Sequence, residues 1–241
     1  MFNAIDVLIP GFPGKGNVAY LGWSTVALLH AGDRLCLLDA SSAGARPMLI
    51  PALQERNIKF EDVTDVFISH LHFDHAANCS LFPHATFHLS WAEWEYANRG
   101  DDIFVNDAAL PLLRSFKKDF IEKDGQEVFE GVYAYLTPGH TPGSTSLVGH
   151  DDLGRWAFTG DAIKNRSELG GKGVGMTLNS QISRESIEKV KKLADRVLPG
   201  HDCWLKLSGD TVVPEGGNDV TIVFPEGITC NGKSNLTLSL D

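Results

Sequence analysis

The sequence has no uninterrupted apolar run long enough to cross a membrane. A bilayer-spanning helix needs about 20 consecutive apolar residues, and no stretch of this 241-residue chain comes near that length. Residues 1–16 also lack the basic segment followed by an apolar segment that marks a secretory signal. These absences predict a protein without a membrane segment, with the cytoplasm as its default location.

Paired cysteines and an excess of basic charge are also missing. The four cysteines, at positions 36, 79, 203 and 230, form no C-x-x-C pair, and a chain of this size can bury a core without disulfides. We therefore expect reduced thiols. Asp and Glu number 31 against 21 Lys and Arg, which gives a net charge of −10. This balance disfavours a broad phosphate-binding face, so no nucleic-acid partner is expected.

The chain does have the composition of a folded globular protein, with 43% hydrophobic residues. An apolar run over residues 63–69 is typical of a strand, and residues 89–123 indicate aromatic-rich helices. An apolar stripe predicts a helix from Ser183, its expected N-cap, to Val197. Strands interleaved with helices predict one α/β domain over residues 1–206. Alternating runs near the end predict a short β appendage over residues 207–241, packed on that domain or on a neighbouring subunit.

Histidines cluster directly after the apolar run 66–68. The sequence there is H-L-H-F-D-H, which contains His70, His72, Asp74 and His75. Four such groups at one strand end would repel one another when charged, unless a cation organises them. Imidazole and carboxylate together suit Zn²⁺, Fe²⁺ or Mn²⁺. The cluster therefore predicts a metal site.

Three later motifs each place one potential ligand directly after an apolar run. His140 occurs in T-P-G-H, Asp161 in T-G-D and His201 in P-G-H, and each follows an apolar run. Glycine or proline flanks each of them. A rigid scaffold presents functional side chains from its connecting loops in this way, so we expect these three residues to join the cluster.

In this order the four motifs resemble the metallo-β-lactamase-fold superfamily. The resemblance spans residues 70–201, and Asp39 resembles the acidic end of an early strand in that family. It implies a four-layer αββα sandwich, in which helices flank two mixed sheets, with a dinuclear metal site at one edge. The implied ligands are His70, His72 and His140 for the first metal, Asp74, His75 and His201 for the second, and Asp161 as the bridge between both.

The resemblance also implies a reaction. A metal-bridging hydroxide would attack an ester, lactone or related acyl bond of a small molecule, and the metals would stabilise the oxyanion. Asp74 is the catalytic residue expected beside that hydroxide, since it could also carry the proton. Two divalent ions are implied, with zinc expected first and iron or manganese as alternatives.

Individual positions select a branch of the superfamily. Asp161 stands where zinc-bound-cysteine β-lactamases have cysteine, and His72 is not the glutamate of the flavodiiron branch, so the chain resembles the glyoxalase II and lactonase branches. Two features depart from those branches. Lys164 replaces the tyrosine that quorum-quenching lactonases carry three residues after the bridging Asp. The strand-like segment after His201 also differs from the helical glutathione-binding region of glyoxalase II.

Three residues are candidate substrate contacts. Lys164 could bind a carboxylate, and Trp91 and Trp94 could line a pocket for an apolar group.

Two other functions stay open, namely a mononuclear iron oxidoreductase of the persulfide dioxygenase type and a non-catalytic subunit on the same fold. The C-terminal alternating strands also allow an oligomer, because exposed strands invite pairing.

Overall fold

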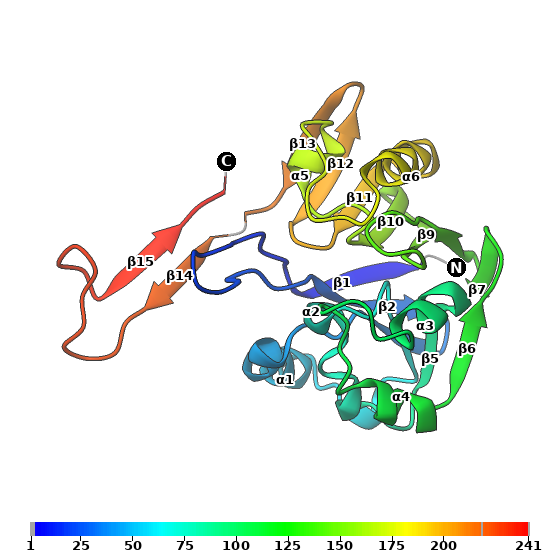
Figure 1. The fold of residues 1–241 in the computed structure, drawn as a ribbon, viewed down its shortest axis with the longest axis horizontal. Helices are drawn as coiled ribbons and strands as arrows, with labels where there is room; N and C mark the ends of the chain where they lie inside the picture. The colour runs from blue at the N-terminus through cyan, green and yellow to red at the C-terminus, as the bar shows by residue number, and fades with distance from the viewer. Residues whose placement is uncertain (1–2, 218, 241) are drawn as a thin grey trace.

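Two large sheets form the centre of the protein (Figure 1). The structure is a computed structural model that describes residues 3–217 and 219–240. In the first sheet, β1 to β3 pair antiparallel and β3 to β6 pair parallel, in sequential order. Its strands are β1 (Ala4–Ile9), β2 (Val26–Ala31), β3 (Arg34–Leu38), β4 (Asp65–Phe67), β5 (Thr86–Ser90) and β6 (Lys118–Ile121).

The second sheet has seven strands in the order β13-β12-β11-β10-β9-β8-β7. Only β10 and β11 pair parallel; the other neighbours are antiparallel. The strands are β7 (Gln126–Phe129), β8 (Val132–Leu136), β9 (Thr145–Asp151), β10 (Gly154–Gly160), β11 (Arg196–Pro199), β12 (Trp204–Ser208) and β13 (Thr211–Glu215). Both sheets are therefore mixed.

Apolar side chains pack both between the two sheets and on their outer faces, because the strands direct alternate residues to two buried faces. In β2, Ala27 and Leu29 face the second sheet, whereas Leu28 faces the outer helices. Across the sandwich, Phe67 of β4 meets Phe158 of β10 edge to face, with ring centroids 6.2 Å apart. Strands that are apolar on both faces need a cover on both sides.

Helices supply the outer cover on each side (Figure 1). The first sheet packs against α1 (Arg46–Glu55), α2 (Phe73–Ala76), α3 (Trp91–Ala97) and α4 (Leu110–Ser115). The second sheet packs against α5 (Arg166–Leu169) and α6 (Ser180–Leu193). The resulting order of helices, sheet, sheet and helices confirms the predicted αββα sandwich. Among the described residues, no helix has the length and apolar character needed to span a bilayer.

An ion pair between the buried Asp65 carboxylate and the partly exposed Arg34 stabilises the start of β4. Asp65 accepts hydrogen bonds from Arg34 Nε at 2.6 Å, His88 Nε2 at 2.7 Å and Thr64 Oγ1 at 2.7 Å. Burial raises the pKa of Asp65, but these hydrogen bonds outweigh burial and lower it to about 2. The ionised carboxylate therefore links β3, β4 and β5 side by side.

The long C-terminal helix is displaced from its predicted position. It begins at Ser180 rather than Ser183, because Asn179 is the N-cap and its side chain accepts from Gln181 N and Ile182 N. Ser183 is buried in the first turns, where its hydroxyl lies 2.6 Å from Thr177 Oγ1. The helix ends at Leu193, and the apolar residues beyond it form β11 instead.

Residues 89–123 are only partly helical. They hold α3 and α4, joined by a loop over residues 98–109, and end in β6. The aromatic residues in this range lie in strands as well as in helices. Phe120 in β6 packs edge to face against Trp91 of α3, with ring centroids 4.9 Å apart.

The C-terminal segment forms a hairpin of its own. Strands β14 (Val220–Val223) and β15 (Asn235–Leu238) make a separate two-stranded sheet that projects from the body (Figure 1). The residues before it, over 204–215, are β12 and β13 of the second sheet. Leu240 O returns to the body, where it accepts a hydrogen bond from Arg166.

Candidate metal centre

Four of the predicted ligands lie directly after β4. His70 and His72 are in the connection that follows the strand, and His72 is the N-cap residue of α2. The helix then carries Asp74 and His75 in its single turn. The strand end and this turn of helix therefore place four chemical groups within one short segment.

The other three residues come from the second sheet. His140 lies between β8 and β9, Asp161 directly follows β10, and His201 follows β11. Because β10 and β11 are parallel, their C-terminal ends meet at one edge. Gly200 permits this approach, since a Cβ there would lie 2.1 Å from Asp161 Oδ1. The structure thus brings all seven predicted ligands to one edge of the sandwich.

The seven side chains form three overlapping groups whose potential ligand atoms lie within 4.8 Å of one another. The groups are His70, His72 and His140; His70, His75 and Asp161; and Asp74, His75 and His201. Asp161 contacts both ends of the site. Its Oδ2 is 3.3 Å from His140 Nε2, and its Oδ1 is 3.3 Å from His75 Nε2 and 3.2 Å from His201 Nε2.

Hydrogen bonds outside the site orient three of the histidine rings. The Nδ1 atoms of His75, His140 and His201 lie 2.7, 2.9 and 3.0 Å from acceptor oxygens of Asp39, Met176 and Trp23. An acceptor at Nδ1 requires the proton there. Each ring therefore carries a proton on Nδ1 and directs Nε2 into the cluster, as the atom available to a metal.

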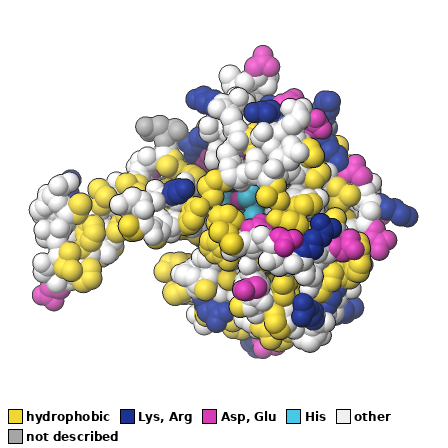
Figure 2. Space-filling model, in the orientation of Figure 1, with side chains coloured by type: hydrophobic (Ala, Val, Ile, Leu, Met, Phe, Trp, Pro, Cys, Tyr) yellow, Lys and Arg dark blue, Asp and Glu magenta, His cyan; other side chains and the backbone are white. Residues whose placement is uncertain are grey.

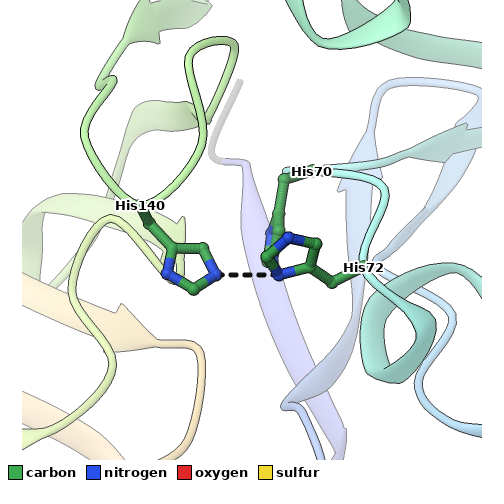
Figure 3. Close-up of side chains that lie close together, drawn as sticks. All are labelled: His70, His72 and His140. Atoms are coloured by element: carbon green, nitrogen blue, oxygen red, sulfur yellow. Dashed lines mark hydrogen bonds between the residues drawn. The ribbon is translucent and has the colours of Figure 1, made fainter. Parts of the chain in front are cut away.

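The other two rings are also oriented by hydrogen bonds, His70 through Nδ1 and His72 through Nε2. Ser69 Oγ donates to Asp39 Oδ2, so it accepts from His70 Nδ1 at 3.1 Å and leaves Nε2 of His70 unprotonated. His72 is reversed, because its Nε2 lies 3.0 Å from Asp102 Oδ2 and its Nδ1 faces inward. Figure 3 shows the result, with His70, His72 and His140 converging; a dashed line joins His72 Nδ1 to His140 Nε2, 3.0 Å apart.

The residues fit divalent cations. Among the described residues, His70 Nε2, His75 Nε2 and Asp161 Oδ1 are buried and have no hydrogen-bond partner. Each such atom costs about 1–3 kcal/mol unless something satisfies it. Two ligand atoms on one tetrahedral zinc lie about 3.3 Å apart, close to the 3.4 Å between Asp74 Oδ2 and His201 Nε2. Bound cations would satisfy all three buried atoms at this spacing.

The first group of histidines is neutral. Burial lowers the pKa of His70 and His72, and it lowers the pKa of His140 to about 3. Neutral imidazole is the form that binds metal. At neutral pH these three rings therefore need no deprotonation before a cation binds.

Carboxylates control the protonation of the residues around Asp161 and His75. Burial raises the pKa of Asp161, but His201, His75 and His140 outweigh it and hold that pKa well below its usual range. Burial lowers the pKa of His75, but the carboxylates of Asp74 and Asp161 outweigh burial and hold that pKa well above its usual value. The carboxylates thus favour positive charge at this position, which a divalent cation would supply.

Two supporting residues were not identified from the sequence. Glu93 of α3 is buried; its Oε1 accepts from Leu71 N at 2.8 Å and its Oε2 from Thr141 Oγ1 at 2.6 Å. It therefore joins the two loops that carry His70, His72 and His140. Its only sequence signal is the S-x-x-E spacing of a helix start, which does not reveal this contact. Asp102, in the loop between α3 and α4, has no motif at all.

A cavity of about 630 Å³ opens above the cluster. Figure 2 shows histidine atoms at the base of a hollow bordered by apolar side chains. The apolar lining comes from Tyr20, Phe73, Phe104, Met176 and Leu178, and the polar lining includes His72, Asp74, His140, Asp161 and His201. A small molecule with an apolar portion would fit such a surface.

Of the three candidate substrate contacts, one lines the cavity and two lie outside it. Lys164 lines the cavity, where its Nζ is 2.9 Å from Glu168 Oε1. Trp91 and Trp94 are not among the described residues that line it. Trp91 is 43% exposed and meets Phe120, and Trp94 packs between Phe120 and a lysine side chain.

Comparisons with known proteins agree with this geometry. A family model described as the metallo-beta-lactamase superfamily matches residues 21–201. A Methanocaldococcus jannaschii protein named a probable metallo-hydrolase is 30% identical over 168 residues, which are 69% of this chain and 70% of that protein. An N-acyl homoserine lactonase of Bacillus cereus is 30% identical over 172 residues, which are 69% of this chain and 66% of the lactonase.

A solved structure shows the same fold. It is that of AidC, a dizinc quorum-quenching lactonase in complex with a product, which is 21% identical to this chain. It superposes with a TM-score of 0.65 and covers 89% of this chain and 92% of AidC. The family-model match, over residues 21–201, includes all seven clustered residues.

Proposed function

Because the chain belongs to the metallo-beta-lactamase superfamily, we propose that it is a dinuclear metal-dependent hydrolase that cleaves an ester, lactone or related acyl bond of a small molecule. One observation carries the proposal: seven side chains converge, and three of their buried inward atoms have no hydrogen-bond partner in the described part of the chain. The names of the metallo-hydrolase and lactonase relatives support the reaction class.

The proposal assigns each cation a set of residues. The first set is His70, His72 and His140, the second is Asp74, His75 and His201, and Asp161 contacts both. Two cations held there would supply an activated water molecule and Lewis acidity for hydrolysis. The second set is as complete as the first, which favours a dinuclear over a mononuclear iron centre. Zinc suits this ligand set, and the name of AidC supports it.

Two aspartates of the chain would have separate roles: one would carry the proton of the attacking water, and the other would hold the two ligand sets in place. Asp74 lines the cavity, and its Oδ2 is 3.4 Å from His201 Nε2. It is therefore the carboxylate placed to take a proton from the attacking water and return it to the leaving group. Asp161 is more buried than Asp74 and spans the two sets, so its role is to fix their separation.

The cavity supports a substrate with an apolar portion and a polar group near the metals. Phe73, Phe104 and Leu178 offer apolar contact. Lys164 would orient the polar group through a hydrogen bond. Because Glu168 neutralises its charge, we propose that Lys164 acts as a donor rather than as an anchor for a free carboxylate.

Two features of the surface complete the proposal. The net charge of −10 supports a small-molecule rather than a nucleic-acid partner. The hairpin of β14 and β15 offers strand edges to a second copy. Light scattering would measure the mass in solution, and a monomer would exclude that pairing.

Hydrolysis assays with and without metal test the function. The purified protein would be screened against aryl esters, lactones and thioesters, then stripped with a chelator and reloaded. We expect activity to disappear on stripping and return on reloading. Asp161→Asn should lose at least about 100-fold, equivalent to about 2.7 kcal/mol, whereas Asp152→Asn, at the exposed opposite end of the β9–β10 hairpin, should match the unmodified protein.

Other results would contradict the proposal. Hydrolysis that survives complete removal of metal would exclude metal-dependent catalysis. Iron in the protein together with oxygen consumption would favour the oxidoreductase instead. Equal activity of the Asp161 and Asp152 variants would exclude the proposed centre.

A further inference from the structure

The loop between α3 and α4 packs directly against the segment after β4 that carries four of the proposed ligands. Phe73 N donates to Phe104 O at 2.8 Å, and Asn106 N donates to Leu71 O at 2.9 Å. These two hydrogen bonds lie on either side of His72 in the sequence. The loop is therefore paired, strand-like, with the backbone of that histidine.

Asp102 uses this position to contact the His72 ring. Its Oδ2 lies 3.0 Å from His72 Nε2 and accepts from Tyr96 OH at 2.7 Å, while its Oδ1 accepts from Phe104 N at 2.8 Å. The Asp102 side chain is only 10% exposed. Three donors therefore hold the carboxylate in one orientation, and the carboxylate in turn holds the imidazole.

We infer that Asp102 is a positioning residue for the metal centre: it fixes the tautomer and the ring orientation with which His72 presents Nδ1 to the first cation. This inference rests on the proposed function. His72 is the one proposed ligand that would bind through Nδ1; the other four histidines direct Nε2 inward. A ring that lost its acceptor at Nε2 could move the proton to Nδ1, and that nitrogen would then be unable to bind metal.

The same loop also forms part of the cavity. Phe104 lines it, and its ring lies 5.8 Å from the His72 ring and 6.2 Å from the Tyr20 ring. Asp102 accepts from the backbone of this residue. The loop therefore both lines the cavity and orients a proposed ligand. Because Asp102 contacts His72, a ligand in the first set, its loss should affect the first cation and leave the second set intact.

Metal affinity, measured separately from activity, tests this role. Each variant would be loaded with zinc and titrated against a chromophoric chelator, which resolves the two binding constants. We expect Asp102→Asn to weaken one of the two by about 10–100-fold, the usual effect of removing such an outer partner. Tyr96→Phe should give a smaller loss at the same cation, since two of the three donors to Asp102 remain.

Asp101→Asn is the matched control, because it makes the same chemical change one residue away at an exposed position; it should bind as the unmodified protein does. Two zinc affinities within about twofold of the unmodified protein in folded Asp102→Asn would overturn the inference and leave the proposed function standing. If Asp102→Asn fails to fold, unchanged affinities in Tyr96→Phe would overturn it. An unmodified protein that binds no metal would exclude the proposed function as well.

Discussion

Replacing Glu93 with alanine should destabilise the protein, although this residue is outside every recognisable motif. The carboxylate is buried and joins two loops that are far apart in the sequence, through Leu71 N and Thr141 Oγ1. Gly143 packs so closely on the start of α3 that a Cβ there would lie 2.0 Å from Glu93 N. The surroundings therefore cannot close easily over the space that the substitution leaves.

The magnitude follows from the partners that lose their acceptor. Thr141 Oγ1 keeps a neighbour in Ser144 Oγ at 2.7 Å, so its loss is partly compensated. Leu71 N is in a buried residue and has no such alternative among the described residues. An orphaned buried donor costs about 1–3 kcal/mol, and the remaining cavity adds roughly 1 kcal/mol. We therefore expect the free energy of unfolding to fall by about 2–4 kcal/mol.

Urea unfolding, followed by tryptophan fluorescence at equal metal content, measures this loss. Glu95→Ala removes the same side chain from an exposed position of the same helix and should stay within about 0.5 kcal/mol of the unmodified protein. If Glu93→Ala lost less than about 1 kcal/mol, or no more than Glu95→Ala, the reasoning that this carboxylate holds the two loops together would be refuted.

Three further predictions concern acid, backbone geometry and metal. The folded pKa of Asp65 is about 2, so its contribution of about 2 kcal/mol is present above the ordinary value of 3.8 and is lost as pH falls towards 2; acid unfolding of Asp65→Asn should show a shallower slope in that range. Gly160→Ala should cost at least about 2 kcal/mol in urea unfolding, because φ is +48° and a Cβ would lie 2.1 Å from Ser69 Oγ. Gly171→Ala, also at positive φ but in open space, should cost less; equal losses would contradict the steric explanation. Stripping the metals should lower the thermal midpoint, and free zinc at 1,000 times its Kd should restore about 4 kcal/mol; an unchanged midpoint in calorimetry would contradict metal-linked folding.

The sequence predicted which side chains converge better than it predicted the bounds of the elements around them. His70, His72, Asp74 and His75 are close in the chain, so their clustering needs no knowledge of the fold. His140 and the later motifs each follow an apolar run, and strand ends do meet at an edge. The pattern of residue types was therefore sufficient to predict that these seven side chains converge. The assignment of each residue to one metal came from the family resemblance and stays a prediction.

The supporting contacts could not be predicted in this way. Glu93 and Asp102 act through tertiary proximity, since their partners lie 22 and 30 residues away in the chain. The C-terminal helix was displaced because Ser183 and Asn179 both suit an N-cap, and burial of the serine decides between them. Trp91 has the composition of a pocket residue, but its direction depends on the packing of α3 against β6.

The most direct test of the dinuclear centre is the metal content of the purified protein, by elemental mass spectrometry, together with that of Asp161→Ala. The two ligand sets and the residue between them predict about two divalent ions per chain, and fewer in the variant. A folded protein that holds no metal, or holds about one ion with or without Asp161, would contradict the account.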